Sequence, residues 1–296
     1  MGGMFKSNPV VFKHRNSLDE AFHPQRKGAR VIAVASGKGG VGKTSLAVNL
    51  SLALSKLGQR VIIMDADLGL ANVEVLLGVT PLFTLFDFLY RGKDVEDILI
   101  PGPGGVFIIS GGSGFLELAG LNNQQQRKII DSLAAFDERA DFVIIDTGAG
   151  ISRNVLSFVA AAGEVIIIVT PEPTSLTDAY SLIKILAMFQ VHSEVLLVVN
   201  RAADERDAAS VTHRMETVVS RFLEIGMVHL GSIYEDRAVI RSVRSQQPFV
   251  IFQPDSIPAL IVSTMAHYLV TGSRSTVGYG NSGIKGFVLK MVRLFR

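Results

Sequence analysis

Cysteine is absent from all 296 positions of the chain. Its absence excludes disulfide bonds, iron–sulfur clusters and thiolate metal sites, and it is typical of proteins from a reducing compartment. Long apolar runs are missing too, because no unbroken stretch approaches the roughly 18 residues of a membrane-spanning helix. The N-terminus also lacks the apolar core of a signal peptide. We therefore expect a cytoplasmic protein that is neither secreted nor integral to a membrane.

Neither sign of charge is in large excess. The 29 Lys and Arg residues nearly balance the 27 Asp and Glu residues, which leaves a formal net charge of +2. The overall charge therefore does not mark the whole chain as a nucleic-acid-binding protein. The apolar fraction of 48% is ample for a large core, and we expect one domain that spans residues 30–271.

Short apolar runs recur along the chain, with amphipathic segments in most of the gaps. Runs of this length, rich in Val and Ile, are typical of strands buried on both faces of a sheet. We predict strands at residues 31–36, 61–65, 106–110, 142–146, 165–170, 195–199 and 228–233. The alternation predicts an α/β fold, a doubly wound and mostly parallel sheet of about seven or eight strands flanked by helices, with its ligand at the carboxyl ends of the strands.

A glycine-rich loop follows the first predicted strand. Its glycines let successive backbone N–H groups approach phosphate oxygens, while Lys43 can supply a positive charge and Thr44 a hydroxyl ligand for Mg²⁺. Leucines at helical spacing predict a helix from Thr44 to Leu57, whose N-terminus would face the phosphates. The residues predicted to bind a nucleotide here are Gly37, Lys38, Gly39, Gly40, Val41, Gly42, Lys43, Thr44 and Ser45.

Polar residues close three other predicted strands. Asp65 and Asp67 end the second strand, and Asp146 ends the fourth in the Walker B arrangement. Carboxylates at these places can hold Mg²⁺ and orient an attacking water, although one of the first two can instead cap the next helix. Asn200 follows the sixth strand, where its amide can present a donor and an acceptor to an adenine edge or serve as a turn residue.

Three segments together resemble the deviant-Walker-A ATPases of the MinD/ParA class. They are the loop at 38–44, the segment Asp65-Ala66-Asp67-Leu68-Gly69 and the segment Asp146-Thr147-Gly148-Ala149-Gly150. The similarity extends over residues 30–270. It implies a MinD-like P-loop fold and an ATPase that uses ATP with Mg²⁺.

Within that class, the chain is similar to the branch of flagellar number and placement regulators called FlhG, FleN or YlxH. The similar segments lie at 65–78, 102–105, 110–114 and 146–152. Gly148 stands where division-site MinD proteins usually carry proline. The nitrogenase iron-protein and cluster-carrier branches require cysteines, so they are excluded.

The resemblance implies roles for the residues around the phosphates. Lys38 matches the signature lysine that reaches the partner's phosphates in an ATP-bridged homodimer, and Lys43 matches the lysine on the β- and γ-phosphates. Asp67 corresponds to the acid that positions the hydrolytic water, and Asp146 to the Walker B acid. These four residues form the expected catalytic set, and the expected metal ligands are Thr44, Asp67 and Asp146.

Other matching residues lie further from the phosphates. Gly150 aligns with the switch glycine near the γ-phosphate, and Asn200 aligns with the adenine-reading asparagine. Asp236 belongs to a segment where many relatives have Pro-Glu-Asp, and Tyr234 departs from that pattern. The resemblance implies slow, partner-regulated hydrolysis to ADP and phosphate, which resets the dimer.

The C-terminal segment at 284–296 has one apolar and one basic side. This pattern predicts a basic amphipathic helix, and the Gly- and Ser-rich stretch at 272–283 predicts a linker before it. Such a helix can attach reversibly to an anionic membrane, more tightly as a pair in a dimer, or it can be an ordinary packed helix. The expected membrane residues are Ile284, Phe287, Val288, Met291, Val292 and Phe295, with Lys285, Lys290, Arg293 and Arg296.

Residues 1–29 are predicted to be a flexible partner-binding segment, because basic residues alternate there with phenylalanines. Similar proteins use an N-terminal motif to stimulate the GTPase FlhF, and Asp19-Glu20-Ala21 with Arg26 matches that motif only in part. Flagellar C-ring components and a flagellar transcription regulator are the other implied partners. A disordered tail without a partner is the alternative.

Two readings of the function remain open. The favoured reading is an ATPase switch that sits on the inner face of the cell membrane and regulates flagellar number or placement. The other is a ParA-type DNA-segregation ATPase or a MinD-type division-site regulator; direct DNA binding is the less favoured expectation, because surface arginines are more often merely solvated. The arginines that a DNA-binding surface would use are Arg206, Arg214, Arg221, Arg237, Arg241 and Arg244.

Overall fold

The computed structural model describes residues 28–67, 72–111, 135–272 and 283–294. The predicted N-terminal segment therefore lies almost wholly outside the described residues, as do most of the predicted linker and the last two residues, Phe295 and Arg296. The side chains of Val292 and Arg293 are also outside the description.

The described residues form one eight-stranded sheet with the order β3-β4-β2-β5-β1-β6-β7-β8. All seven predicted strands are confirmed, although β5 and β7 run further than predicted. Their bounds are β1 Arg30–Ser36, β2 Val61–Ala66, β4 Phe107–Ser110, β5 Phe142–Ala149, β6 Glu164–Val169, β7 Glu194–Ala202 and β8 Gly226–Tyr234. These seven pair in parallel. The eighth strand, β3 (Leu99–Pro101), pairs antiparallel to β4 at the sheet edge and was not predicted.

Helices cover both faces of the sheet, as the doubly wound prediction requires. The α-helices are α1 Lys43–Lys56, α2 Asn72–Leu77, α3 Leu85–Tyr90, α6 Arg153–Ala161, α7 Pro173–Met188, α8 Glu205–Phe222, α9 Arg237–Ser245, α10 Phe249–Phe252, α11 Ile257–Thr271 and α12 Gly283–Leu294, with short 3₁₀ turns η1 Pro103–Gly105 and η3 Ala135–Glu138. The predicted helix after the glycine-rich loop is α1, which begins and ends one residue earlier than predicted.

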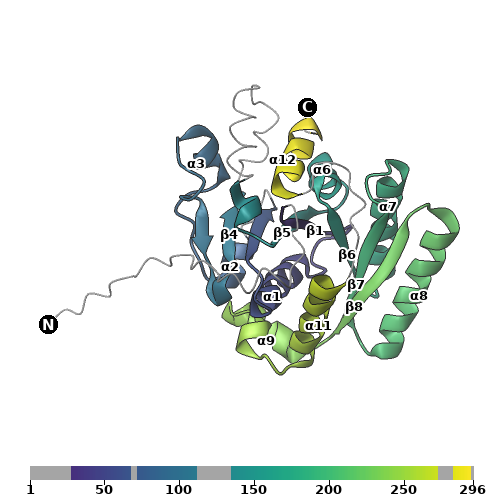
Figure 1. Cartoon of the computed structure of the whole chain (residues 1–296). Helices are drawn as coiled ribbons and strands as arrows, with labels where there is room; N and C mark the ends of the chain where they lie inside the picture. Colours follow the sequence, from purple (N-terminus) through teal and green to yellow (C-terminus); the bar gives the residue numbers. More distant parts are fainter. Residues whose placement is uncertain (1–27, 68–71, 112–134, 273–282, 295–296) are drawn as a thin grey trace.

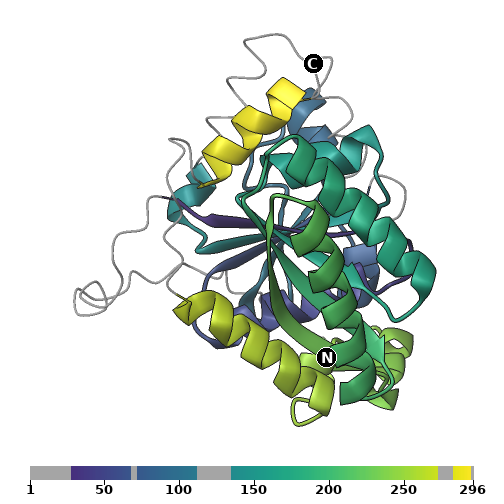
Figure 2. The ribbon, with the colours of Figure 1, turned by 90° about the vertical axis from the view of Figure 1, so that its right-hand side faces the viewer.

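Two separate apolar cores result, one on each face of the sheet. Alternate residues of β1 belong to opposite cores, so Val31 packs on one side and Ile32 on the other. Helices α3, α6, α7, α8 and α12 contribute to the first core, and α1, α2, α10 and α11 to the second. Figure 1 shows α6 and α12 above the sheet and α1 and α11 below it. Figure 2, turned to the β8 side, shows α12 and α11 on opposite sides of the sheet.

The strand order brings the predicted polar residues to one end of the sheet. β5 lies between β2 and β1, and Asp146 of β5 is in register with Asp65 of β2 and Val34 of β1. Because these strands are parallel, their carboxyl ends meet beside the glycine-rich loop, which is where ligands bind in open α/β sheets. The fold therefore assembles the candidate site from β1, β2 and β5.

The C-terminal helix α12 is docked on the body of the protein. Ile284, Phe287, Val288 and Met291 are each at most 3% exposed and belong to the first core. The Phe287 ring stacks on Phe158 of α6, with 6.5 Å between ring centroids. The ordinary packed helix, which the sequence left open, is thus what this conformation contains.

Burying four large apolar side chains stabilises this docking by roughly 6–12 kcal/mol, and the conformational entropy lost on ordering the residues of α12 opposes it. No described helix has the length and apolarity needed to cross a membrane.

Candidate active site

Two side chains fix the backbone of the glycine-rich loop by hydrogen bonds. The Ser36 hydroxyl donates to the backbone carbonyl of Lys38 at 2.7 Å, and the Asn200 amide donates to the carbonyl of Val41 at 2.7 Å. Gly42 has a φ of +100°, and a Cβ there would lie 2.4 Å from Nδ2 of Asn200. Only glycine fits this position, because a larger residue would be strained at this φ and would collide with the Asn200 amide.

Helix α1 presents its N-terminus to the inside of this loop. It starts at Lys43, and its first turn contains no acidic residue. The unpaired N–H groups and the positive end of the helix dipole are therefore free to attract an anion. Phosphate binding by this loop stays a prediction, and the start of α1 has the polarity that it requires.

Lys43 is buried at the base of the loop, with 8% of its surface exposed. Burial lowers the pKa of its ammonium group, while the neighbouring Asp146 and Asp67 carboxylates oppose that change. The structure thus brings together three residues that the sequence predicted to act together.

Asp146 is fully buried, and neither of its carboxylate oxygens has a hydrogen-bond partner of ordinary geometry among the described residues. Burial raises its pKa to about 7, although the nearby Thr44 hydroxyl and Lys43 ammonium limit the rise. An unpaired buried carboxylate is costly unless a cation meets it. A hard divalent cation prefers oxygen ligands such as those of Asp146 and Thr44, so these residues fit Mg²⁺.

Asp67 is half-buried and faces Gly148 near the end of β5. Its backbone N–H donates to Asp65 at 3.0 Å, and the Asn72 amide approaches its carboxylate at 3.4 Å. A Cβ at Gly148 would lie 3.7 Å from the Asp67 carboxylate. The Asp67 side chain therefore lies between the segment after β2 and the end of β5. Residues 68–71, which continue this segment, lie outside the described residues.

Asp65 has a different environment. It supports the alternative that one of the two aspartates caps the next helix. Its carboxylate accepts from the backbone N–H groups of Asp67 and Val73, so it braces the start of α2. Burial raises its pKa to about 8, and the neighbouring Glu74 and Asp146 add to the rise.

Sequence reasoning missed two acidic residues near the site. Glu74 of α2 is buried, and its carboxylate oxygens have no partner of ordinary geometry among the described residues. Glu172 lies at the N-cap of α7 and binds the ammonium group of Lys38 at 2.5 Å, while the Thr174 hydroxyl accepts a second bond from Lys38 at 3.0 Å. This ion pair is exposed, and the Lys38 charge lowers the pKa of Glu172.

Two of the outer predicted residues have clear structural roles. The Gly150 N–H donates to the carbonyl of Ser36 at 2.9 Å, which ties the residue after β5 to the residue before the glycine-rich loop. Asp236 follows β8 and caps α9 by accepting from the Ala238 N–H at 2.6 Å. Asn200 lies near the end of β7, two strands from β1, and its bond to Val41 shows that it contacts the loop directly.

The buried carboxyl groups predict a dependence of stability on pH. An acid whose pKa is raised in the fold keeps a proton that the unfolded chain releases, so the free energy of unfolding falls as pH rises toward the folded pKa. With pKa values of about 8 for Asp65 and about 7 for Asp146, we expect the nucleotide-free protein to lose roughly 1–2 kcal/mol between pH 7 and 8.5. That corresponds to a fall in Tm of roughly 2–6 °C.

Thermal unfolding of Asp65→Asn provides the control for this prediction. Its amide cannot ionise, so its Tm should change less than that of the wild type over the same interval. The interval starts at pH 7 because ordinary histidines have mostly lost their proton there. If Tm falls with pH equally in the two proteins, Asp65 does not keep its proton in the folded state.

Comparisons with known proteins identify the family of this chain. A family model described as an AAA domain matches residues 29–198. The antiactivator FleN of Pseudomonas aeruginosa is 40% identical over 246 residues, which cover 83% of this chain and 86% of FleN. The flagellum site-determining protein YlxH of Helicobacter pylori is 27% identical over 93% of each chain.

A solved structure extends the likeness to the fold. The septum site-determining protein MinD of Pyrococcus horikoshii, in complex with Mg-ADP, superimposes with a TM-score of 0.66 and 25% identity. The match covers 84% of this chain and 99% of that chain. On the family model and the identity to FleN, the chain belongs to the MinD/ParA class of ATPases and is related to the FlhG branch of that class.

Proposed function

We propose that this protein is a Mg²⁺-dependent ATPase switch. The observation that carries the proposal is the buried, unpaired Asp146 carboxylate beside Lys43, at the N-terminus of α1. This arrangement leaves one negative group for a cation and one positive group for phosphate oxygens. Mg²⁺ would be held by Thr44, Asp146 and Asp67, and it supplies neutralising charge to the phosphates when bound. The Mg-ADP complex of the related MinD supports this assignment.

Hydrolysis requires a positioned water and a neutralised phosphate. Asp67 is half-buried beside the end of β5, and its carboxylate can accept a hydrogen bond from a water there. Lys43 and the N–H groups of the loop stabilise negative charge on the phosphoryl oxygens. Gly150, which is bonded to Ser36, couples the loop after β5 to the phosphate loop.

The second lysine of the loop supports a homodimer around ATP. Lys38 is bonded to Glu172 and Thr174 at the exposed side of the loop, not to the acids around Lys43. An ammonium group in this position can serve a second subunit packed against the loop. Dimerisation would require Lys38 to exchange Glu172 for the partner's phosphates, and hydrolysis would end that contact.

Reversible membrane association would follow from the C-terminal helix. Its apolar stripe is buried in this conformation, so lipid binding requires that α12 leave the body. Lys285 and Lys290 are exposed on its outer side and can approach anionic headgroups. Two released helices in one dimer would bind far more tightly than one.

The relatives give the switch a biological setting. FleN is named an antiactivator, and YlxH is named a flagellum site-determining protein. We therefore assign this protein to the control of flagellar number or placement. Its partners would be the GTPase FlhF, flagellar C-ring components or a flagellar transcription regulator, reached through residues 1–29 or the dimer surface.

A DNA-binding function has less support, because the candidate arginines are divided between two helices. Arg206, Arg214 and Arg221 lie on α8, which packs on the first core, whereas Arg237, Arg241 and Arg244 lie on α9, where Val239 packs on the second core. The two groups thus belong to helices on opposite faces of the sheet and do not form one continuous basic face.

Deleting residues 284–296 tests the membrane part of the proposal. We expect the wild type to sediment with phosphatidylglycerol-containing vesicles in the presence of ATP and the truncated protein to stay in solution, because the truncation removes the apolar stripe and its cations. The truncated protein should still hydrolyse ATP. Vesicle binding that persists without residues 284–296 would contradict this role, and salt-sensitive binding to DNA without lipid binding would favour the ParA-type function.

A further inference from the structure

The first turn of α12 is capped by a side chain from a distant part of the chain. The N–H of Ile284 donates to Oδ1 of Asp137 at 2.5 Å, and the N–H of Lys285 donates to Oδ2 of the same carboxylate at 3.1 Å. The first N–H groups of a helix lack partners within the helix, and a carboxylate there also complements the helix dipole. Asp137 thus stabilises the start of α12 in its docked position.

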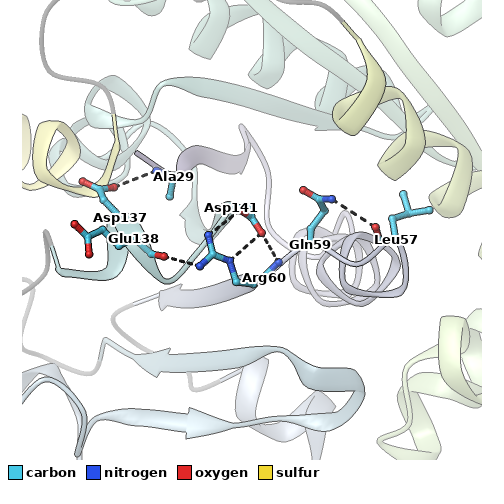
Figure 3. A network of polar contacts seen from close by, with 7 residues as sticks. All are labelled: Ala29, Leu57, Gln59, Arg60, Asp137, Glu138 and Asp141. Atoms are coloured by element: carbon cyan, nitrogen blue, oxygen red, sulfur yellow. Dashed lines mark hydrogen bonds and ion pairs between the residues drawn. The ribbon is translucent and has the colours of Figure 1, made fainter. Parts of the chain in front are cut away.

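The same carboxylate also holds the start of the folded domain. Oδ1 of Asp137 accepts from the N–H of Ala29 at 3.2 Å, and Figure 3 shows Asp137 turned toward Ala29. Ala29 is buried directly before β1. Ala29 and the first turn of α12 therefore meet at one side chain, although they lie near opposite ends of the described sequence.

The backbone that carries Asp137 is fixed by Arg60. Its guanidinium group donates to the Asp141 carboxylate at 2.9 Å and to the Glu138 carbonyl at 2.5 Å, as Figure 3 shows. The backbone N–H of Arg60 also donates to Asp141 at 2.8 Å. Asp137 is therefore held on a turn that Arg60 braces at Glu138 and Asp141.

The approach of the two chain ends is too close for a side chain. Gly283 has a φ of +88°, and a Cβ there would lie 2.5 Å from Oδ1 of Asp137. A Cβ at Gly28 would lie 3.0 Å from Cα of Gly283. The contact is thus built from two glycine backbones and one carboxylate, and a single added methyl group would push it apart.

We propose that Asp137 is the latch that keeps α12 on the body, and that it couples α12 to Ala29 at the start of β1. Release of α12 breaks two of the three hydrogen bonds that described residues donate to this carboxylate. Because coupling between two sites is reciprocal, a partner that draws Ala29 away from Asp137 also loosens α12. The proposal rests on the function above, in which a released α12 binds lipid.

Hydrogen exchange in the nucleotide-free, full-length protein tests the latch without lipid. In Asp137→Ala, the amides of α12 should exchange roughly 5- to 30-fold faster than in the wild type, which is the effect of losing one N-terminal cap. Gly283→Ala should act in the same direction through its clash with the carboxylate. Asp255→Ala, at an exposed aspartate in the turn before α11, is the matched control and should leave α12 unchanged.

The amides of β1 and β5 show whether the variants remain folded, since they should exchange as slowly as in the wild type. If Asp137→Ala unfolds, Asp137→Asn replaces it, because the amide keeps the shape of the side chain and one acceptor, and an intermediate acceleration is expected. Wild-type exchange of α12 in a folded Asp137→Ala or Asp137→Asn protein would overturn the latch.

The coupling has its own readout at the other chain end. Deleting residues 284–296 should accelerate exchange of the Ala29 amide, and an unchanged rate would overturn the coupling. Vesicles of phosphatidylglycerol and phosphatidylethanolamine then separate the two proposals. Faster exchange of α12 in Asp137→Ala without vesicle binding by any of the proteins would support the latch and contradict the membrane function. ATP-dependent vesicle binding with unchanged exchange of α12 in Asp137→Ala would support the membrane function and contradict the latch.

Discussion

The Asp67→Ala variant is expected to hydrolyse ATP roughly 10²- to 10⁴-fold more slowly than the wild type while it still forms a dimer with ATP. Asp67 is only half-buried and faces Gly148 across the site, so its removal leaves the phosphate loop, Lys43 and Asp146 in place. Binding therefore survives, but the attacking water loses the group that orients it. Phosphate release and the molecular mass in solution with ATP or ADP measure both effects.

Lys43→Ala separates loss of chemistry from loss of binding. It removes the buried ammonium group that meets the phosphates, and it leaves Asp146 buried without the nearby positive charge. We expect this variant to bind ATP poorly and to remain monomeric. An Asp67→Ala protein that behaves in the same way, or that hydrolyses ATP at the wild-type rate, would contradict the role assigned to Asp67.

Lys38→Ala is expected to remain monomeric with ATP, and its hydrolysis should fall by roughly 10²- to 10³-fold, as for the loss of one donor to a developing negative charge. The Tm should barely change, because exposed ion pairs such as Lys38–Glu172 add little stability. ATP binding by the monomer should persist, since Lys43 and the loop N–H groups remain. Sedimentation with ATP and a nucleotide-binding titration measure the two properties separately.

The matched control for Lys38 is Lys184→Ala, which removes an exposed lysine from the middle of α7. It should dimerise and hydrolyse ATP as the wild type does. If Lys38→Ala still dimerises at the ATP concentration that suffices for the wild type, the subunits meet through another surface. The signature-lysine assignment is then wrong for this chain.

The parallel strands were predictable because each is a short apolar run between polar segments, and this pattern depends only on burial of both faces. β3 was not, since its three residues end at Pro101 on the sheet edge and only the pairing with β4 makes them a strand. The phosphate loop was predictable because its glycines and lysines are adjacent in sequence.

Contacts between segments that are distant in the chain could not be predicted from the sequence. Glu172 binds Lys38 across 134 positions of the chain, and nothing in its local sequence marks it. Glu74 carried a weak signal, as an acid within the otherwise mostly apolar residues 72–77. The two sides of α12 were equally readable, but an apolar stripe fits a lipid surface and a protein core alike, so the sequence could not decide between them.

The short connection between β5 and α6 has a mechanical consequence. Gly150 contacts the phosphate loop, and α6 starts at Arg153. Arg153 in turn donates to the carbonyl of Leu294 at the far end of α12, and Phe158 of α6 stacks on Phe287. The segment at Gly150, which we propose to respond to the phosphates, and the helix that supports α12 are thus consecutive parts of one backbone. A tilt of α6 would therefore move the surface on which α12 packs. Such a change needs no motion between separate domains.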